Sequence, residues 1–484
     1  MAPLKIAMIG AGYVGLVSGA CFAKIGHDVV CVDADRAKID ALNAGQIPFF
    51  EPGLAELVGA MRAAGRLSFA RGLTGALNGA EAVFICVGTP ARASDGAADL
   101  TFVDAAAAEI GAALSGYAVV VVKSTAPIGT GDAVEAIIAN VLGARNFAVV
   151  SNPEFLREGA AIGDFLKPDR IVVGADDARA RETLAEIYRP LTDAGAPILF
   201  TGRRSAELIK YSANVFLAMK VTFINEIADL CEAVGGDIAD VADGIGLDAR
   251  IGRKFLNAGP GFGGSCFPKD TVALTRIAAE ARAPLRLVET LVEVNVARKI
   301  AMADKIARAC GGDLRGKRIA VLGLTYKPDT DDMRDAPSLT IVPALLARGA
   351  QVTAYDPEGM ARARPLLPGV SFAPDAMSAL HGADALALIT EWAEFRALDF
   401  GAARAAMRGK AVVDLRNALD HARLRGLGFE VTGVGKGMDA GQTAAADAIL
   451  RLRAQIRAPA GSAVSPVDEL IAERREAIKL ERPA

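Results

Sequence analysis

The chain has 484 residues, too many for one hydrophobic core, and this length predicts about three domains. Its 54 basic and 57 acidic side chains leave a net charge of −3 without a basic block, so nucleic acid is not an expected partner. Apolar runs are short, as in "AVVVV" (118–122), and glycines interrupt the first of them, so we expect neither a membrane span nor a secretory signal. Without export, the six cysteines are expected to be reduced thiols in the cytoplasm.

Residues 4–35, "LKIAMIGAGYVGLVSGACFAKIGHDVVCVDAD", predict a strand, a glycine turn, a helix and a second strand. The glycines fit G-x-G-x-x-G, which lets the backbone approach a pyrophosphate at a helix N-terminus. An acidic side chain at the end of the second strand suits the ribose of NAD and disfavours the extra phosphate of NADP. The predicted NAD contacts of this segment are Gly10, Gly12, Tyr13, Val14, Gly15 and Asp33.

Further strands are expected where short, nearly continuous apolar runs occur, since parallel strands covered by helices on both faces have this composition. These runs are 82–90, 118–125, 147–155 and 170–175. Three of them end in Thr89, Thr125 and Glu154, and the carboxyl ends of parallel strands are where ligands bind in such sheets. For each of these residues alone, a cap on the following helix is the alternative interpretation.

Residues 205–235 predict one long helix, because apolar residues recur at intervals of three and four without a proline. Apolar positions occupy much of its circumference, which favours packing between domains or subunits. Lys210 and Asn214 lie four residues apart and share a face of this helix. They are either part of a solvated polar stripe or a pair aimed into a cleft, where they would stabilise an alkoxide.

Residues 311–457 form a second α/β segment, with strands expected within 317–335, 350–357, 383–390 and 411–418. The glycine fingerprint is missing after Gly323, so this unit is not expected to hold a dinucleotide in the usual way. The predicted fold class is α/β: two Rossmann-like doubly wound parallel-sheet domains, 1–200 and 311–457, joined by a central long-helix region, 201–310. Residues 458–484 are predicted to be a linker and a charged tail, to which we assign no function.

Cys266 is the cysteine with unusual surroundings, in "GPGFGGSCFPKD" (259–270). Glycines precede it, Lys269 and Asp270 follow, and a nearby ammonium would favour the thiolate; an unreactive loop thiol is the alternative. The other five cysteines lie in apolar patterns and are expected to be small buried residues. The three histidines each have a structural explanation, and neither CxxC nor HxxxH occurs, so we expect no histidine-based catalysis and no metal site.

An NAD site, a second nucleotide-sized domain and one activated cysteine indicate more than simple alcohol oxidation. A thiolate can add to an aldehyde and form a thiohemiacetal, which can lose a hydride and leave a thioester. Water then releases a carboxylate. One site could therefore carry an alcohol to an acid with two NAD.

Residues 4–450 resemble the nucleotide-sugar dehydrogenases, the family of UDP-glucose and GDP-mannose dehydrogenases. The resemblance rests on "GAGYVGL", "EPGL", "KSTAPIGTG", "SNPEFLREGAAIGDFLKPDRIVVG", "AELIKYSAN", "RIGRKFLNAGPGFGGSCFPKD" and "LTYKPDTDDMRDAPS". The run "FLKPDRIVVG" is similar to the UDP-glucose branch. Ser265 stands where UDP-N-acetylmannosamine dehydrogenases usually carry histidine. The tail beyond residue 457 is not explained by the family pattern.

The resemblance implies a role for each matched residue. Cys266 would be the nucleophile, Lys210 and Asn214 would stabilise the alkoxide and oxyanion, and Asp270, Thr125 and Glu154 would act on the hydrolytic water. The implied NAD contacts, besides the glycine turn and Asp33, are Lys38, Thr89, Thr125, Glu158, Lys269 and Arg334. The implied substrate contacts are Glu154, Phe155, Leu156, Lys210, Asn214, Arg250, Phe255, Leu256, Asn257, Gly263 and Lys327, with Arg250 reaching across from a second subunit of a homodimer built on the long helix.

The implied reaction is the NAD-dependent four-electron oxidation of UDP-glucose to UDP-glucuronate through intermediates on Cys266. Oxidation of GDP-mannose is one alternative. A two-electron β-hydroxyacid-type dehydrogenase is another, but it leaves Cys266 and the third domain unexplained. A protein that binds NAD and nucleotides without catalysis is disfavoured by the joint presence of Cys266, Lys210, Asn214 and Asp270.

Overall fold

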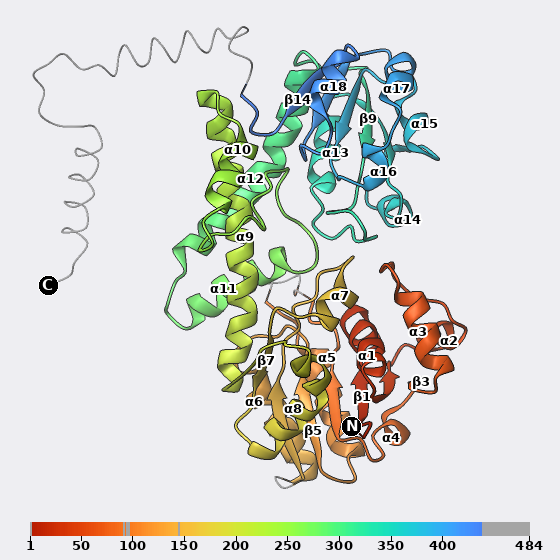
Figure 1. The fold of residues 1–484 in the computed structure, drawn as a ribbon, viewed down its shortest axis with the longest axis vertical. Coiled ribbons are helices and arrows are strands. Elements are labelled where there is room, and N and C mark those ends of the chain that lie inside the picture. Colours follow the sequence, from red (N-terminus) through yellow and green to blue (C-terminus); the bar gives the residue numbers. More distant parts are fainter. Residues whose placement is uncertain (1, 91, 93–96, 144–145, 438–484) are drawn as a thin grey trace, which may run out of the picture.

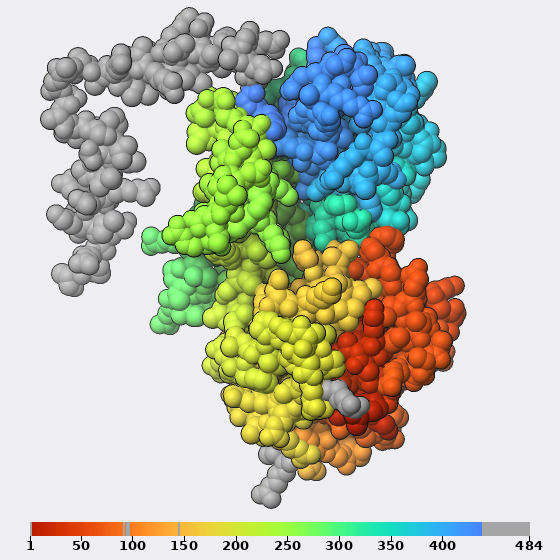
Figure 2. Space-filling model, viewed as in Figure 1, coloured from red at the N-terminus to blue at the C-terminus, as the bar shows by residue number. Residues whose placement is uncertain are grey.

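The computed structural model describes residues 2–90, 92, 97–143 and 146–437, which form two sheet-containing units joined by long helices (Figure 1). The N-terminal unit, red to yellow, and the C-terminal unit, blue, form two lobes in the space-filling view (Figure 2). The predicted tail, 458–484, lies outside the described residues. Among the described helices, none combines the length and the apolar character that crossing a membrane requires.

The N-terminal unit is built on an eight-stranded sheet in the order β3-β2-β1-β4-β5-β6-β7-β8. Its strands are β1 (Lys5–Ile9), β2 (Asp28–Val32), β3 (Leu67–Ala70), β4 (Ala82–Ile85), β5 (Ala118–Val122), β6 (Phe147–Ser151), β7 (Ile171–Gly174) and β8 (Ile198–Thr201). All neighbours are parallel except β6 and β7, which meet in an antiparallel arrangement at Ser151 and Gly174. The expectation of parallel strands throughout is wrong at this pair, because an apolar run indicates burial and carries no information about direction.

Helices cover both faces of this sheet. They are α1 (Tyr13–Lys24), α2 (Arg36–Asn43), α3 (Leu54–Ala63), α4 (Leu73–Ala76), α5 (Thr101–Ala113), α6 (Thr130–Leu142), α7 (Ala161–Leu166) and α8 (Ala178–Asp193). Alternate residues of one strand enter different apolar clusters: Met8 packs with Phe22 and Phe84, whereas Ile9 packs with Val83. The central strands are therefore buried on both sides, which is why their sequences are continuous apolar runs.

Four helices form the region between the two sheets: α9 (Arg203–Val234), α10 (Ile238–Gly246), α11 (Phe267–Glu280) and α12 (Arg286–Ala309). The 32-residue α9 runs from the N-terminal unit toward the C-terminal unit (Figure 1). It ends at Gly235, whose φ of 81° lies in the left-handed region that terminates helices. The predicted helix 205–235 agrees with these bounds within two residues.

The C-terminal unit is built on a six-stranded parallel sheet in the order β11-β10-β9-β12-β13-β14. Its strands are β9 (Arg318–Leu322), β10 (Gln351–Tyr355), β11 (Ser371–Phe372), β12 (Ala385–Leu388), β13 (Ala411–Asp414) and β14 (Glu430–Gly433). Its helices are α13 (Ser338–Ala347), α14 (Met360–Ala363), α15 (Ala376–Leu380), α16 (Ala393–Arg396), α17 (Phe400–Ala406) and α18 (His421–Gly426). The prediction of two α/β units with helices between them is confirmed.

Candidate active site

The glycine turn after β1 leaves room for a ligand at the start of α1. Gly10 has a φ of 101°, and a Cβ on Gly15 would lie 1.8 Å from the Gly10 carbonyl oxygen, so both positions require glycine. Nothing lies within 4 Å of the place where a Cβ on Gly12 would stand. Asp33, directly after β2, accepts a hydrogen bond from the Ala11 N–H at 2.8 Å. This turn, the open helix N-terminus and the acid fit the pyrophosphate and ribose of NAD.

Other predicted NAD residues surround the same edge of the sheet. Lys38 Nζ lies 2.7 Å from Asp33 Oδ2, and Val14 lies half-buried in the first turn of α1. The Thr89 hydroxyl donates to the Thr125 carbonyl oxygen at 2.6 Å, which joins the segments that follow β4 and β5. The fold therefore brings the ends of these two strands together, as the sequence predicts.

Lys210 and Glu154 form a buried ion pair, with 2.9 Å between Nζ and Oε1. Their side chains are only 3% and 6% exposed, so the alternative of a solvated polar stripe on α9 is wrong. Burial opposes the charge of Glu154, but Lys210 and the Leu156 N–H outweigh it and lower the pKa of this carboxyl. Burial also opposes the charge of Lys210, and Glu154 with Cys266 and Asp270 raises the pKa of its ammonium.

Asn214, one turn after Lys210, points to a second buried acid. Its Nδ2 donates to Asp270 Oδ2 at 2.6 Å, and Lys269 Nζ lies 2.8 Å from Asp270 Oδ1. Asp270 is 1% exposed and lies in the first turn of α11. The spacing of four residues on α9 thus places an ammonium and an amide side by side, as predicted.

Cys266 stands at the N-terminus of α11, with its Sγ 3.5 Å from the Ser265 hydroxyl oxygen. Burial raises the pKa of its thiol, Glu154 and Asp270 add to this, and Lys210 opposes it. The neighbouring ammonium that favours the thiolate is Lys210 rather than Lys269, which is paired with Asp270, and burial outweighs the effect of Lys210.

The glycines before Cys266 allow its loop to pack closely between two other segments. A Cβ on Gly263 would lie 2.3 Å from the Asp335 carbonyl oxygen, and one on Gly264 would lie 2.7 Å from the Tyr326 ring. On the other side, Asn295 of α12 accepts from the Phe262 N–H at 2.8 Å and donates to its carbonyl oxygen at 3.1 Å. The loop is therefore held between α12 and the segment that follows β9.

Glu158 connects the N-terminal unit to this loop through Ser265 and to the C-terminal unit through Tyr326 and Arg334. Its carboxylate accepts from the Ser265 hydroxyl at 3.0 Å, the Tyr326 hydroxyl at 3.2 Å and Arg334 Nη2 at 3.1 Å, and Lys327 donates to its carbonyl oxygen. Burial and the nearby charge of Asp332 raise the pKa of Glu158 to about 7. Three residues predicted to bind NAD or substrate, Glu158, Lys327 and Arg334, thus lie together beside Cys266.

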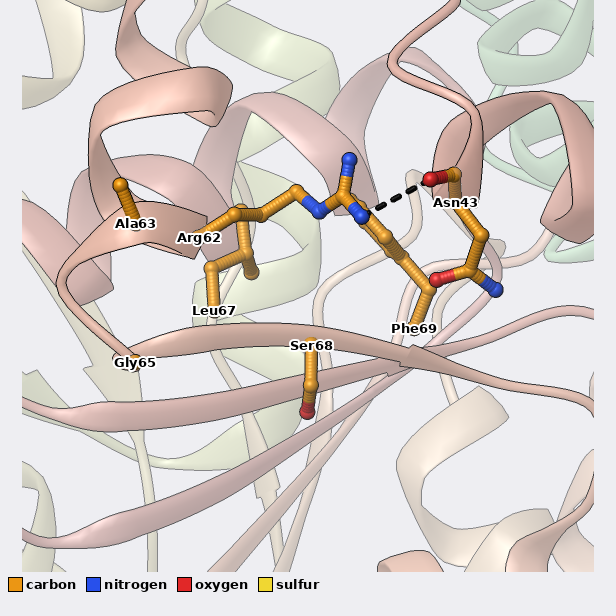
Figure 3. Close-up of a pocket in the computed structure, with 7 residues that line it drawn as sticks. All are labelled: Asn43, Arg62, Ala63, Gly65, Leu67, Ser68 and Phe69. Atoms are coloured by element: carbon orange, nitrogen blue, oxygen red, sulfur yellow. Dashed lines mark hydrogen bonds between the residues drawn. The ribbon is translucent and has the colours of Figure 1, made fainter.

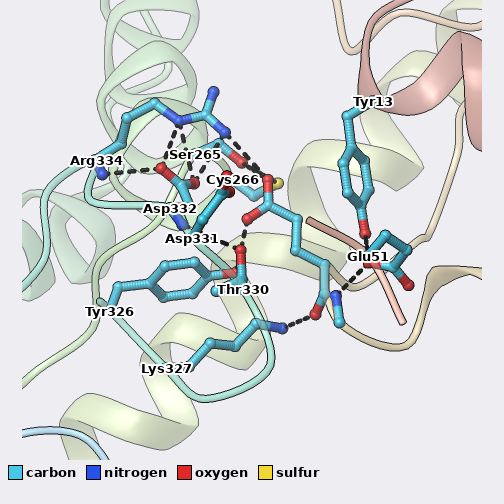
Figure 4. A network of polar contacts seen from close by, with 12 residues as sticks. Tyr13, Glu51, Ser265, Cys266, Tyr326, Lys327, Thr330, Asp331, Asp332 and Arg334 are labelled. Atoms are coloured by element: carbon cyan, nitrogen blue, oxygen red, sulfur yellow. Dashed lines mark hydrogen bonds and ion pairs between the residues drawn. The ribbon is translucent and has the colours of Figure 1, made fainter. Parts of the chain in front are cut away.

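Glu51, in the "EPGL" segment, connects the segment that follows Glu158 to Tyr13 beside the glycine turn (Figure 4). It accepts from the Gly159 and Ala161 N–H groups, the latter at 2.8 Å, and the Tyr13 hydroxyl donates to it. Tyr13, one of the predicted NAD contacts, is therefore linked through Glu51 to the segment that carries Glu158.

The remaining predicted substrate residues differ in their surroundings within this chain. The Arg250 side chain is 89% exposed and contacts Asp248. Asn257 accepts from Arg253 at 2.8 Å, Leu256 is buried, and Phe255 has a positive φ of 66°. The side chain of Phe155 is stacked against Arg170, with 3.6 Å from the guanidinium carbon to the ring centroid.

The turn after β9 is filled by the chain itself. Asp356, directly after β10, accepts from the Leu324 N–H at 2.6 Å and from the Trp392 ring N–H at 3.1 Å. A Cβ on Gly323 would lie 2.6 Å from the Thr390 nitrogen. The expectation that this turn does not hold a dinucleotide in the usual way stays a prediction, which depends on the missing glycine fingerprint after Gly323.

Two hollows of the N-terminal unit differ in how they relate to the predicted site residues. A cavity of about 590 Å³ lies at the edge strand β3, lined by Asn43, Arg62, Ala63, Gly65, Leu67, Ser68 and Phe69 (Figure 3). The Arg62 guanidinium already donates to the carbonyl oxygens of Leu42 and Asn43, and no predicted site residue lines this cavity. A cavity of about 40 Å³ is lined in part by Glu154, Phe155, Leu156 and Lys123 and adjoins the site.

Sequence reasoning missed several residues that hold the site together. Lys123 lies in the "KSTAPIGTG" run with no predicted role, Asn295 and Tyr326 carry no local signal, and Ser265 only argues against a UDP-N-acetylmannosamine dehydrogenase. Each acts on a residue far away in the chain, such as Asn295 on Phe262. A single sequence contains no signal for such contacts.

These features define a dehydrogenase-like enzyme with one dinucleotide site, a second nucleotide-sized unit and a cysteine between them. Family models for three successive domains match: the NAD binding domain over residues 4–192, the central domain over 204–297 and the UDP binding domain over 320–421. The chain belongs to the UDP-glucose/GDP-mannose dehydrogenase family. NAD is the cofactor that the first of these domains binds.

Individual relatives are similar along nearly the whole chain. A UDP-glucose 6-dehydrogenase of Rhizobium meliloti is 59% identical over 435 residues, which are 90% of this chain and 100% of the relative. One from Bacillus subtilis is 45% identical over 434 residues, 89% of this chain and 93% of the relative. The solved structure of a UDP-glucose dehydrogenase from Pyrobaculum islandicum has a TM-score of 0.83 at 40% identity and covers 90% of this chain and 98% of that one.

Proposed function

We propose that this enzyme oxidises UDP-glucose at C6 to UDP-glucuronate and reduces two NAD for each sugar. The observation that carries the proposal is the position of Cys266 beside the Lys210–Glu154 pair and the Asn214–Asp270 pair. The relatives described as UDP-glucose 6-dehydrogenases and the matching UDP binding domain support this substrate.

Each oxidation requires that an oxygen at C6 be stabilised while C6 loses a hydride, which bound NAD accepts. We assign this stabilisation to the Lys210 ammonium and the Asn214 amide, which lie on one face of α9. The first oxidation leaves an aldehyde. The Cys266 thiol then adds across the carbonyl: the S–C6 bond forms, the thiol proton passes to the oxygen, and a thiohemiacetal results. Loss of the second hydride and the hydroxyl proton leaves a thioester.

Hydrolysis returns the enzyme to its starting state. Water adds to the thioester carbon, the C6–S bond breaks, and the products are the carboxylate, the Cys266 thiol and a proton. We assign the orientation of this water to Thr125, Glu154 and Asp270. Support comes from the burial of both acids next to the cysteine and from the place of Thr125 at the end of β5.

We assign NAD to the unit of residues 1–200, the subunit contact to 201–310 and the UDP moiety to 311–457. NAD would be held by the glycine turn, Asp33, Lys38 and Thr89, together with Glu158, Lys269 and Arg334. The sugar nucleotide would contact Phe155, Leu156, Phe255, Leu256, Asn257, Gly263 and Lys327. The proximity of Glu158, Arg334 and Lys327 to the cysteine loop supports this arrangement.

We also propose a homodimer built on α9. Large apolar side chains are exposed along this helix at intervals of seven or eight residues, at Leu208, Phe216, Phe223 and Leu230. This spacing places them on one side of the helix, and an exposed apolar stripe of this kind is typical of a subunit contact. Arg250, exposed here, would reach the partner's site. Light scattering should give twice the chain mass for the wild type and a monomer for Phe223→Asp; a monomeric wild type would contradict the dimer.

The cysteines support a reducing location: all six are free, and we place the enzyme in the cytoplasm. Cell fractionation would test this location, since the protein should appear in the fraction that contains cytoplasmic markers.

The decisive experiment supplies UDP-glucose, UDP-galactose and GDP-mannose separately and counts NADH per sugar consumed. We expect two NADH with UDP-glucose, and we expect Cys266→Ser to lose the four-electron reaction. A ratio of one would contradict the covalent route, and turnover of GDP-mannose alone would favour the alternative substrate.

A further inference from the structure

Lys123 carries a buried ammonium to which the mechanism above gives no role. It follows β5 directly, and its side chain is 4% exposed. Its Nζ donates to Asn152 Oδ1 at 3.2 Å and to the Tyr188 hydroxyl oxygen at 3.3 Å. Both partners are uncharged, and none of the residues that the structure describes gives this ammonium a directly bonded counter-ion. A charge buried in this way opposes folding unless other charges compensate it.

The charge that Lys123 faces is the carboxylate of Glu154. Lys123 and Glu154 line the same cavity of about 40 Å³, and each favours the charged form of the other. The remaining titratable groups around it are Cys86 after β4, Tyr188 of α8 and Lys210 of α9. Burial lowers the pKa of Lys123 to about 8, against the attraction of Cys86 and Glu154.

A count of the buried charges shows a surplus. Lys123 and Lys210 are two buried cations, and Glu154 is the anion that favours the charged form of both. Asp270 has partners of its own, Lys269 and Asn214. In the absence of substrate, the cluster of Lys123, Lys210 and Glu154 therefore carries one positive charge in excess. An alkoxide or oxyanion on the substrate, next to Lys210, would bring the count to two cations and two anions.

We propose that Lys123 is a positioning residue that acts through Glu154: it shares the charge of this carboxylate, so that Lys210 can turn to a substrate oxyanion without leaving a buried anion unpaired. The inference rests on the proposed function. Its physical basis is that the surplus charge is matched only when the oxyanion exists, and interactions of this kind lower the barrier of the chemical step.

The first test measures folding and needs no substrate. Melting temperatures are compared for Lys123→Met, Lys210→Met and the double variant. Tyr188 still donates to Asn152 at 2.6 Å when the ammonium is removed, so Lys123→Met alone is expected to melt at or above the wild-type temperature. In Lys210→Met, Lys123 is the remaining cation beside Glu154. The melting temperature of the double variant should therefore be several degrees lower than the value obtained by adding the two single shifts. Additive effects would overturn the charge sharing, whatever the substrate is.

The second test measures turnover with both substrates saturating. Lys123→Met should lower kcat about tenfold to a hundredfold without a change in KM, below the effect of removing a donor in direct contact. Lys123→Arg, which keeps the charge, should restore most of kcat, and Tyr188→Phe is the control that keeps the ammonium. The kcat of the wild type should fall as the pH rises past about 8, because Lys123 loses its proton there. The kcat of Lys123→Met should not show this fall. A normal kcat in Lys123→Met, or no rescue by Lys123→Arg, would overturn the inference; an inactive wild type would contradict only the proposed function.

Discussion

The close contact between the cysteine loop and the C-terminal unit makes Gly263→Ala a sharp perturbation. The φ of Gly263 lies outside the left-handed region, so the substitution acts through space alone. The added Cβ would lie 2.3 Å from the Asp335 carbonyl oxygen, whereas ordinary contact begins at 3.4 Å. The loop or its neighbour must therefore move by about 1 Å, and a displacement of that size next to a reacting group costs about a hundredfold in rate.

Asp335 is not free to absorb this movement. Its carbonyl oxygen accepts from Lys299 Nζ at 2.9 Å, and the Gly264 N–H donates to the Arg334 carbonyl oxygen at 2.8 Å. We therefore expect the cysteine to move, with a fall in kcat/KM of about a hundredfold in an assay of NADH formation.

Gly244→Ala is the matched control, because Gly244 lies in α10 and nothing stands within 4 Å of the added Cβ. This variant should keep its activity and gain slightly in stability, since alanine favours a helix over glycine. If Gly263→Ala turned over like the wild type while remaining folded, the position of the loop against Asp335 would not matter for catalysis, and the reasoning would be refuted.

Two further predictions concern Glu158 and Asp33, which we propose as NAD contacts. Glu158 has a pKa raised from 4.5 to about 7, so its contribution to stability is fully present below pH 4.5 and is lost as the pH rises through 7. Glu158→Gln should flatten the pH dependence of the melting temperature between these values, and an unchanged slope would contradict this. Asp33→Ala should raise KM for NAD and reduce the preference over NADP, since the acid both suits a ribose diol and supports the turn at Ala11. Steady-state kinetics with both cofactors would check it, and an unaltered preference would count against the role of Asp33.

Local patterns were sufficient for the central strands and the long helix. The strands β1, β4 and β5 are buried on both faces, so their runs of apolar residues are continuous and visible in the sequence. The four strands that were not predicted, β3, β8, β11 and β14, are the four edge strands of the two sheets. Each has two to four residues and is at least partly exposed, so its composition does not separate it from a loop.

The sequence by itself determined the glycine turn with Asp33, the placing of Lys210 and Asn214 on one helix face and the presence of one cysteine in a glycine-rich loop, because each depends on residues close together in the chain. Only the tertiary structure decided the antiparallel contact of β6 with β7, the pairing of Lys210 with Glu154 and the burial that raises the pKa of the Cys266 thiol. Those depend on burial and on charges brought in from distant segments, as when Glu154 and Lys210 meet across 56 residues. The role proposed for Lys123 also depends on the tertiary structure, because the fold brings its ammonium near the carboxylate of Glu154.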